Sequence, residues 1–221
     1  MPVMTRPLLL GHRGLRLRGE PPENTMTAFD RALELGCDGF EFDVRRTADN
    51  REVIFHDAEC SGRELAAVPY AQVHHLALLD EVLAHYAGRA FLDIELKAPG
   101  LELGTLASIA RHRLETGFVV SSFFPDILRE LHSRNPDVPL GFICDRESRL
   151  AHWSELPGEY VIPHFSLLRR ELLNNLHDCG KKVMVWTVNN VDDMVRSAAW
   201  GVDGIISDHP SLLVRTVERS L

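Results

Sequence analysis

Two histidines and two carboxylates lie in the first part of the chain, at or near the ends of three apolar runs. His12 is in GHRG, Glu41 and Asp43 are in GFEFDVRRT, and His56 is in VIFHD. Imidazole gains and loses protons near neutral pH, so one histidine can act as a general base and the other as a general acid. We therefore interpret these four residues as parts of one site for proton transfer.

Alternation of polar and apolar residues places acids on one face of each of two expected strands. Glu41 and Asp43 alternate with apolar residues in FEFDV, as do Asp93, Glu95 and Lys97 in LDIELK. Carboxylates that share a buried face repel one another strongly, and a divalent cation compensates this charge most economically. Oxygen ligands without cysteine favour one Mg²⁺ or Ca²⁺ ion over Zn²⁺, with Mn²⁺ as a further candidate.

Each of these interpretations has a structural alternative. The acids could form a salt-bridge network with Arg45, Arg46 and Lys97, and a single histidine at the end of a strand more often packs or caps than catalyses. We favour the metal site because two strands carry the same pattern and histidines flank both. The other histidines lack such neighbours, and we expect His164, which ends a later strand, to be a packing residue.

Two cations and one aromatic residue complete the candidate site. Arg13 and Lys97 would hold phosphoryl oxygens and balance charge while a phosphodiester bond breaks; plain salt bridges are the alternative, and both roles can coexist. Trp186 is either an apolar wall for the substrate or a core residue. In PENT, Glu23 and Asn24 could face the site, although this segment most simply begins a helix.

The elements that position these residues follow a strand-then-helix rhythm, repeated about eight times with short connections. This alternation indicates a parallel sheet, and eight units in a chain of this length predict a closed TIM (β/α)8 barrel. A doubly wound open sheet is disfavoured because no G-x-G-x-x-G follows the first strand. We expect strands at 8–10, 40–44, 53–55, 91–96, 118–120, 140–143, 160–162, 183–188 and 204–206. We expect a first helix capped by Asn24 or Thr25 and ended by Gly36, a loop with one short turn at 57–78, and helices at 79–86, 101–114, 126–133, 148–156, 167–179, 191–200 and 212–221.

A barrel gathers functional side chains at the carboxyl ends of its strands. The apolar faces of the strands must pack outward on the helices, so the acids point into the barrel. The polar or aromatic residues expected around this mouth are His12, Glu41, Asp43, His56, Glu95, Lys97, Ser122, Trp186 and Asp208.

Composition narrows the class of protein. The 221 residues suit one barrel domain spanning 1–221, and a formal net charge of −8 argues against nucleic-acid binding. No segment at the N-terminus is long enough for a signal sequence or a membrane span. Cysteines occur singly, which predicts buried, reduced thiols and a cytoplasmic protein without integral membrane association. They are Cys37, Cys60, Cys144 and Cys179.

Taken together, the motifs resemble those of the glycerophosphodiester phosphodiesterase family. The matching segments, in the order of the family, are GHRG, PENT, the G-x-D-x-x-E-x-D run that ends at Asp43, HD, LDIELK, VWTVN and GVDGIISDHP. The resemblance implies a TIM barrel of the phospholipase C-like phosphodiesterase type that hydrolyses glycerophosphodiesters to glycerol 3-phosphate and an alcohol. It also implies that Glu41, Asp43 and Glu95 are metal ligands. His12 and His56 would be the acid–base pair, and Arg13 and Lys97 would bind the phosphate.

One departure from the family concerns the segment after His56. Members usually carry a longer insertion there, which covers the site and helps to select the glycerol end, whereas HDAECSGREL passes quickly to the next helix. The abbreviated insertion predicts a more open mouth. Two alternatives to the leading function follow: a lysophospholipase D-type phosphodiesterase with a bulkier substrate, and a noncatalytic barrel that binds phosphate esters.

Overall fold

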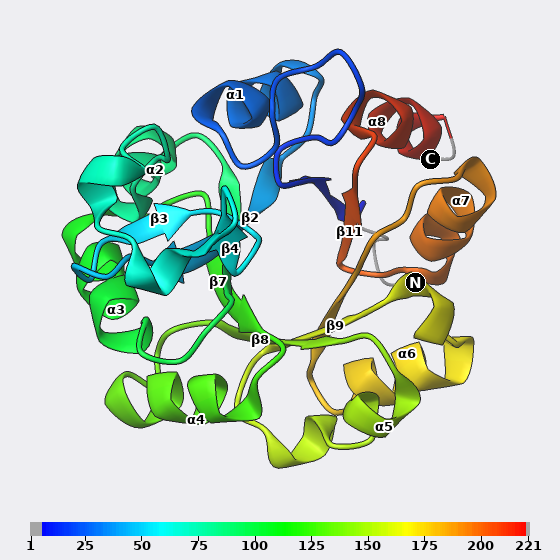
Figure 1. Cartoon of the computed structure of the whole chain (residues 1–221). Helices are drawn as coiled ribbons and strands as arrows, with labels where there is room; N and C mark the ends of the chain where they lie inside the picture. The colour runs from blue at the N-terminus through cyan, green and yellow to red at the C-terminus, as the bar shows by residue number, and fades with distance from the viewer. Residues whose placement is uncertain (1–5, 220–221) are drawn as a thin grey trace.

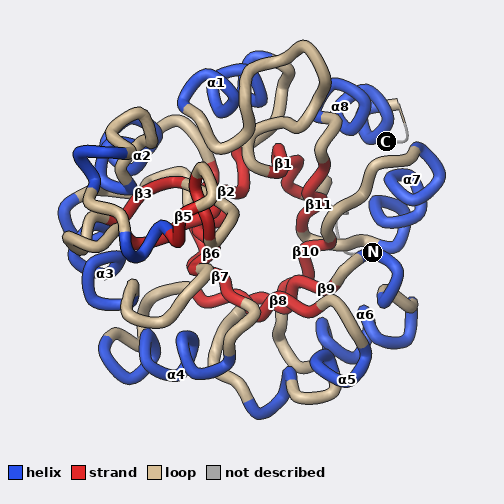
Figure 2. The backbone as a smooth tube through the Cα atoms, viewed as in Figure 1, coloured by secondary structure: helices blue, strands red, loops and turns tan. Residues whose placement is uncertain are grey.

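A closed barrel of eight parallel strands forms the centre of the molecule, and helices surround it (Figure 1, Figure 2). The computed structural model describes residues 6–219. The barrel strands are β1 (Leu8–His12), β2 (Gly39–Arg46), β6 (Phe91–Leu96), β7 (Phe118–Ser122), β8 (Leu140–Cys144), β9 (Tyr160–Pro163), β10 (Lys182–Val185) and β11 (Gly204–Ser207). The helices are α1 (Met26–Glu34), α2 (Leu79–Tyr86), α3 (Glu102–Arg111), α4 (Pro125–Arg134), α5 (Glu147–Leu150), α6 (Arg170–Asp178), α7 (Val191–Trp200) and α8 (Pro210–Glu218).

The first strand closes the barrel. β1 pairs in parallel with β11 on one side, where Leu10 lies opposite Ile206, and with β2 on the other, where His12 lies opposite Glu41. The first and last strands therefore lie side by side (Figure 1). The predicted TIM barrel is confirmed.

The two faces of β2 explain why its acids point inward. Phe40 and Phe42 are fully buried on the outer face, where the ring of Phe40 stacks on Phe29 of α1 at 4.2 Å and meets Tyr86 of α2 edge-on at 4.9 Å. Since successive strand residues alternate in direction, the acids between these rings face the barrel interior. Packing of the outer face of β2 on α1 and α2 therefore determines that its acids face the barrel interior.

Local signals at the first helix act as expected. Thr25 is the N-cap of α1, and its Oγ1 accepts a hydrogen bond from the backbone N–H of Ala28 at 3.2 Å. Gly36 follows the helix with φ 97°, a conformation that glycine adopts without strain. The helices predicted at 148–156 and 167–179 are shorter in the structure: α5 gives way to a 3₁₀ turn at Trp153–Glu155, and a similar turn at Phe165–Leu167 precedes α6.

The third expected strand does not belong to the barrel. β3 (Glu52–Ile54) runs antiparallel to β2, with Val44 opposite Ile54, because the chain turns back over residues 47–51. Phe55 then donates its backbone N–H to Asp43 O at 2.9 Å. His56 therefore returns to the level of Asp43 from outside the ring of barrel strands.

Residues 57–78 are more ordered than the predicted loop. They form a hairpin of β4 (Glu59–Cys60) and β5 (Arg63–Glu64), followed by 3₁₀ turns at Leu65–Ala67 and Tyr70–Gln72. An apolar cluster of their own supports them, consisting of Val53, Cys60, Leu65, Val68 and Val73. Elements of two or three residues carry no periodicity, which is why the sequence did not reveal them.

Two further expectations concern the cysteines and membranes. All four cysteines are free, as predicted, but Cys179 is exposed, so the expectation of four buried thiols was wrong. Among the described residues, every helix is too short or too polar to cross a bilayer.

Candidate active site

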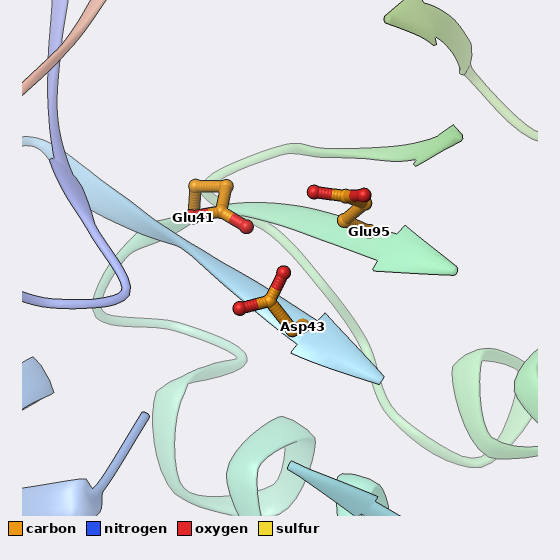
Figure 3. Close-up of side chains that lie close together, drawn as sticks. All are labelled: Glu41, Asp43 and Glu95. Atoms are coloured by element: carbon orange, nitrogen blue, oxygen red, sulfur yellow. The ribbon is translucent and has the colours of Figure 1, made fainter. Parts of the chain in front are cut away.

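Three carboxylates converge at the mouth of the barrel. Glu41 and Asp43 come from β2 and Glu95 from the neighbouring β6, where it lies directly opposite Asp43 (Figure 3). One oxygen from each lies within 4.8 Å of the others, and the exposed fractions of the three residues are 4%, 0% and 6%. This spacing suits a single hard cation with oxygen ligands.

Glu41 carries the clearest sign of a missing partner. Its Oε2 accepts the backbone N–H of Arg13 at 3.0 Å, whereas its Oε1 is buried and has no hydrogen-bond partner within residues 6–219. Burial, and then the charges of Asp43 and Glu95, raise the pKa of Glu41 well above its usual range. A buried carboxylate oxygen without a donor is unfavourable, and a cation at this point would stabilise it. The donor set therefore fits a divalent ion.

Lys97 joins the other two acids. Its Nζ lies 2.6 Å from Glu95 Oε1 and 3.0 Å from Asp43 Oδ1. Burial alone would raise the pKa of Asp43, but Lys97 and Arg13 lower it on balance. Burial raises the pKa of Glu95 to about 7 despite the charge of Lys97. Part of the alternative salt-bridge network thus exists beside the carboxylate cluster.

The two other arginines of that alternative take different partners. Arg45 donates from Nε to the backbone oxygen of His56 at 2.6 Å, and Arg46 reaches the backbone oxygen of Gly100 at 3.5 Å. Arg45 therefore helps to hold His56 in place, and neither residue forms an ion pair with the three acids in the described structure.

His12 is buried and held from one side. Its Nδ1 lies 2.7 Å from Asp208 Oδ1, and its Nε2 lies 3.7 Å from Glu41 Oε2. Asp208 also accepts a hydrogen bond from Asn189 Nδ2 at 2.6 Å. Burial would raise the pKa of Asp208, but the contacts with His12 and Asn189 lower it. His12 thus turns its Nε2 toward the carboxylates.

His56 is half-buried and reaches the site from the segment that follows β3. Its Nδ1 lies 2.7 Å from Asp57 Oδ1. Burial lowers the pKa of His56, although Asp57 and Asp43 oppose this shift. Both histidines thus have an Nδ1 engaged by a carboxylate, which leaves Nε2 available for proton transfer.

Arg13 occupies a left-handed backbone conformation with φ 51°. Its side chain is buried, with Nε 3.1 Å from Asp43 Oδ2 and Nη1 2.6 Å from Glu23 Oε1. Asn24 is also left-handed, with φ 58°, and its amide donates to Asp43 Oδ2 at 2.7 Å and accepts from Asp43 N at 3.2 Å. Glu23 and Asn24 therefore do point toward the mouth, in addition to leading into α1.

A cavity of about 110 Å³ connects these groups. Its polar part is lined by His12, Arg13, Glu41, His56, Asp93, Glu95 and Lys97, and its apolar part by Phe123, Ile143, Ile162, Trp186 and Ile206. The ring of Trp186 meets Phe123 edge-on at 5.4 Å and His164 at 5.5 Å, and its Nε1 donates to Ile162 O at 3.0 Å. The side chain is both a wall of the cavity and packed, so the two alternatives for Trp186 hold together.

The structure brings together the residues predicted for the mouth, with one exception. Asp43 and Asp208 do not line the cavity themselves, but they contact Arg13 and His12, which do. Ser122 is buried, donates to Leu96 O at 2.8 Å and does not line the cavity. Sequence reasoning missed the hydrogen bonds of Asn24, the partner of His12 and the contribution of Phe123. For Asn24 the signal was its place in PENT, next to the helix cap; for Asp208 it was its position just past the last strand.

Comparison with known proteins now identifies the family. The model of the glycerophosphoryl diester phosphodiesterase family matches residues 12–83 and 101–212. The chain belongs to this family. It is a phosphodiesterase, as the motifs had indicated.

Individual members of the glycerophosphodiester phosphodiesterase family align with this chain over nearly its whole length. A glycerophosphodiester phosphodiesterase of Caldanaerobacter subterraneus is 29% identical over 96% of this chain and 98% of its own. Human lysophospholipase D GDPD1 is 22% identical over 92% of this chain and 84% of its own. A crystal structure of a putative glycerophosphoryl diester phosphodiesterase from Silicibacter pomeroyi has a TM-score of 0.88 and 27% identity, covering 99% of this chain and 95% of that one.

Proposed function

We propose that this phosphodiesterase hydrolyses glycerophosphodiesters to glycerol 3-phosphate and an alcohol, and that the reaction requires a divalent cation held by Glu41, Asp43 and Glu95. The observation that carries the metal requirement is the buried, unpartnered Oε1 of Glu41 within a cluster of three carboxylates. Oxygen ligands favour Mg²⁺ or Ca²⁺, with Mn²⁺ as an alternative. When bound, the ion supplies positive charge that polarises a phosphoryl oxygen.

The protein groups divide the remaining work. Arg13 and Lys97 bind the phosphoryl oxygens, since both are cations that line the cavity, Arg13 buried and Lys97 partly buried. His12 and His56 exchange protons at Nε2: one removes a proton from the attacking hydroxyl or water, and the other protonates the departing alkoxide. Their Nδ1 atoms stay on Asp208 and Asp57, which keeps each ring oriented.

The relatives support the glycerol-containing substrate. The enzyme of Caldanaerobacter and two Bacillus relatives carry the name glycerophosphodiester phosphodiesterase and match this chain over more than nine tenths of its length. The cavity is also small enough to favour a compact group over a long chain.

A second candidate keeps the chemistry and changes the alcohol. One relative is named lysophospholipase D, and Phe124, which follows the cavity-lining Phe123 in the sequence, is 44% exposed. This surface could contact an acyl chain that extends out of the cavity. The abbreviated segment at 57–78, from which we expect a more open mouth, also favours this second candidate.

Product analysis tests both candidates. Glycerophosphocholine, glycerophosphoethanolamine and a lysophosphatidylcholine are incubated with the protein in the presence of Mg²⁺, Ca²⁺ or Mn²⁺, and in each case again with excess chelator. We expect glycerol 3-phosphate from the water-soluble diesters, loss of product on chelation, and a higher kcat/KM than for the lysolipid. A preference for the lysolipid would favour the second candidate. Binding without turnover under every metal condition would instead indicate a noncatalytic barrel.

A further inference from the structure

Asp93 is a carboxylate in the cavity to which the reaction described above gives no role. It lies on β6 two residues before Glu95, is 1% exposed and lines the cavity. Ser121 Oγ donates a hydrogen bond to its Oδ1 at 2.5 Å. Its Oδ2 is buried and has no hydrogen-bond partner anywhere in the described part of the chain.

One oxygen of the Asp93 carboxylate is thus held by Ser121, and the other has no hydrogen-bond partner within the described residues. Buried polar atoms in native proteins are almost always paired, because burying an unpaired acceptor is unfavourable. The contact with Ser121 prevents the side chain from turning both oxygens toward a new partner. A donor that enters the cavity would therefore meet Oδ2 in a fixed position.

Asp93 lies beside the proposed ion site without being one of its three carboxylates. Across the β2–β6 ladder Asp93 lies opposite Glu41, whereas Glu95 lies opposite Asp43. Asp93 is thus one inward-facing residue deeper in the barrel than Glu95. It is also absent from the set of carboxylates whose oxygens lie within 4.8 Å of one another.

The cavity also has an aliphatic wall. Ile143 of β8, Ile162 of β9 and Ile206 of β11 line it across from β6. A volume of about 110 Å³ has room for several water-sized groups, and hence for a three-carbon alcohol. One acceptor opposite three aliphatic side chains matches a small molecule with a carbon skeleton and at least one hydroxyl.

We propose that Asp93 accepts a hydrogen bond from a free hydroxyl of the alcohol that stays on phosphorus, and so selects glycerol esters over esters of simple alkanols. This inference rests on the proposed function, because it places the glycerol unit in the cavity. A site built to pair with a hydroxyl rejects the analogue without it, since its own acceptor is then left buried and unpaired.

Calorimetric binding of two phosphate monoesters tests the inference without requiring turnover. Glycerol 3-phosphate and n-propyl phosphate have the same three-carbon length and differ in two hydroxyls. We expect the wild-type protein in Mg²⁺ buffer to bind glycerol 3-phosphate about tenfold or more tightly, the effect of one hydrogen bond to a charged acceptor. In Asp93→Ala this ratio should fall below about threefold, and Asp93→Asn should keep much of it because the amide still pairs with a hydroxyl.

Two further variants keep the test decisive. Asp126→Ala removes an exposed aspartate of α4 that does not line the cavity, and it should leave the ratio as in the wild type. Ser121→Ala releases the Oδ1 of Asp93 and should lower the ratio, which provides a second reading if Asp93→Ala does not fold. A wild-type ratio near one, or an unchanged ratio in both Asp93→Ala and Ser121→Ala, would overturn the inference.

A titration with Mn²⁺ alone separates this role from metal binding. We expect Asp93→Ala to bind Mn²⁺ within about twofold of the wild type, since the ligand set is unchanged. A tenfold loss of Mn²⁺ affinity with an unchanged ester ratio would make Asp93 part of the metal site and refute the selection role. If the protein discriminates between the monoesters but hydrolyses no diester, the proposed activity fails while the assignment of Asp93 stands.

Discussion

The Nδ1 atom of His12 lies 2.7 Å from Oδ1 of Asp208, although 196 residues separate them in the sequence. Asn189 holds the other carboxylate oxygen of Asp208 at 2.6 Å. The imidazole ring is therefore fixed through its far nitrogen, and its Nε2 lies on the side of Glu41. This arrangement gives a buried histidine one defined tautomer and one defined direction.

Replacing Asp208 should slow the reaction while leaving ion binding intact. In Asp208→Asn the amide no longer favours a proton on Nδ1 of His12, and we expect kcat to fall about 10- to 100-fold with little change in Mn²⁺ affinity. The control is His177→Ala, which removes a surface histidine that lies 2.9 Å from Asp203. Its kcat should equal that of the wild type. Normal turnover in Asp208→Asn would contradict the orienting role.

Removing either of the two histidines proposed for proton transfer should have a larger effect. For His12→Ala and His56→Ala we expect kcat to fall by about 10²- to 10⁴-fold on glycerophosphocholine, because no other group near the cavity replaces the imidazole. His164→Ala serves as the matched control, since His164 packs on Trp186 outside the cavity lining. Its activity should stay within about tenfold of the wild type. The acid–base assignment fails if His56→Ala turns over normally.

The effect of Glu41→Gln on thermal stability should depend on whether the divalent ion is present. Without a divalent cation, the variant removes a buried carboxylate that is crowded by two others, so its Tm should equal or exceed that of the wild type. With millimolar Mg²⁺ or Mn²⁺ the wild type should gain stability by binding the ion, whereas the variant should not. Thermal melts of both proteins with and without the ion check this. An equal ion-induced rise in Tm would show that Glu41 is not a ligand.

Asn24 and Asn50 form a natural pair for a test of side-chain function. Both have φ 58°, so Asn→Ala imposes a similar backbone penalty on each. Asn24 also exchanges two hydrogen bonds with Asp43, whereas Asn50 is exposed. We expect Asn24→Ala to lower the free energy of unfolding by about 1–3 kcal/mol more than Asn50→Ala, and to weaken Mn²⁺ binding. Equal losses in urea titrations would assign the effect to the backbone alone.

Glu52, on the outer strand β3 and not among the proposed ion ligands, should make stability depend on pH. Burial raises its pKa from 4.5 to about 7, with Thr105 and Arg111 opposing the shift. The folded state therefore binds a proton more tightly than the unfolded state, so this contribution to stability is present below about pH 4.5 and is lost as pH rises through about 7. Because Glu52 is partly exposed, the effect is on the order of 1 kcal/mol, or about 2–4 °C in Tm.

The comparison of Glu52→Gln with the wild type at pH 5 and pH 8 measures this effect. The variant should be more stable than the wild type at pH 8 and should lose the advantage at pH 5. Glu64→Gln, at an exposed position in the β4–β5 hairpin, should change neither melt. A Glu52→Gln variant with no gain at pH 8 would show that Glu52 ionises at its ordinary pKa.

The barrel itself could be predicted because its strands are strongly patterned. Each is a short buried run followed by a helical segment, and the alternation around Glu41 and Glu95 gave the inward face directly. β3 has the same apolar character, and nothing in its residues indicates that it runs antiparallel to β2. The direction of a strand depends on the turn before it, which here includes the left-handed Asn50.

The missing parts of the site depend on contacts between distant segments. The pairing of His12 with Asp208 arises from the position of β11 beside β1, which no local pattern encodes. The hydrogen bonds of Asn24 depend on its positive φ in the turn before α1. Whether each carboxylate oxygen of Asp93 has a hydrogen-bond partner depends on which group can reach it, Ser121 or an incoming ligand. Local patterns reveal the residue types, and only the closed barrel reveals their partners.

The position of β1 between β2 and β11 has a consequence for the newly made protein. Synthesis proceeds from the N-terminus, so all three carboxylates and both histidines have been made once β6 is complete, whereas Asp208 follows the last strand. A chain that stops short of β11 carries these side chains without the partner that orients His12. The proposed hydrolytic activity should therefore develop only after β11 and Asp208 have been made, because a shorter chain cannot close the barrel between β1 and β11.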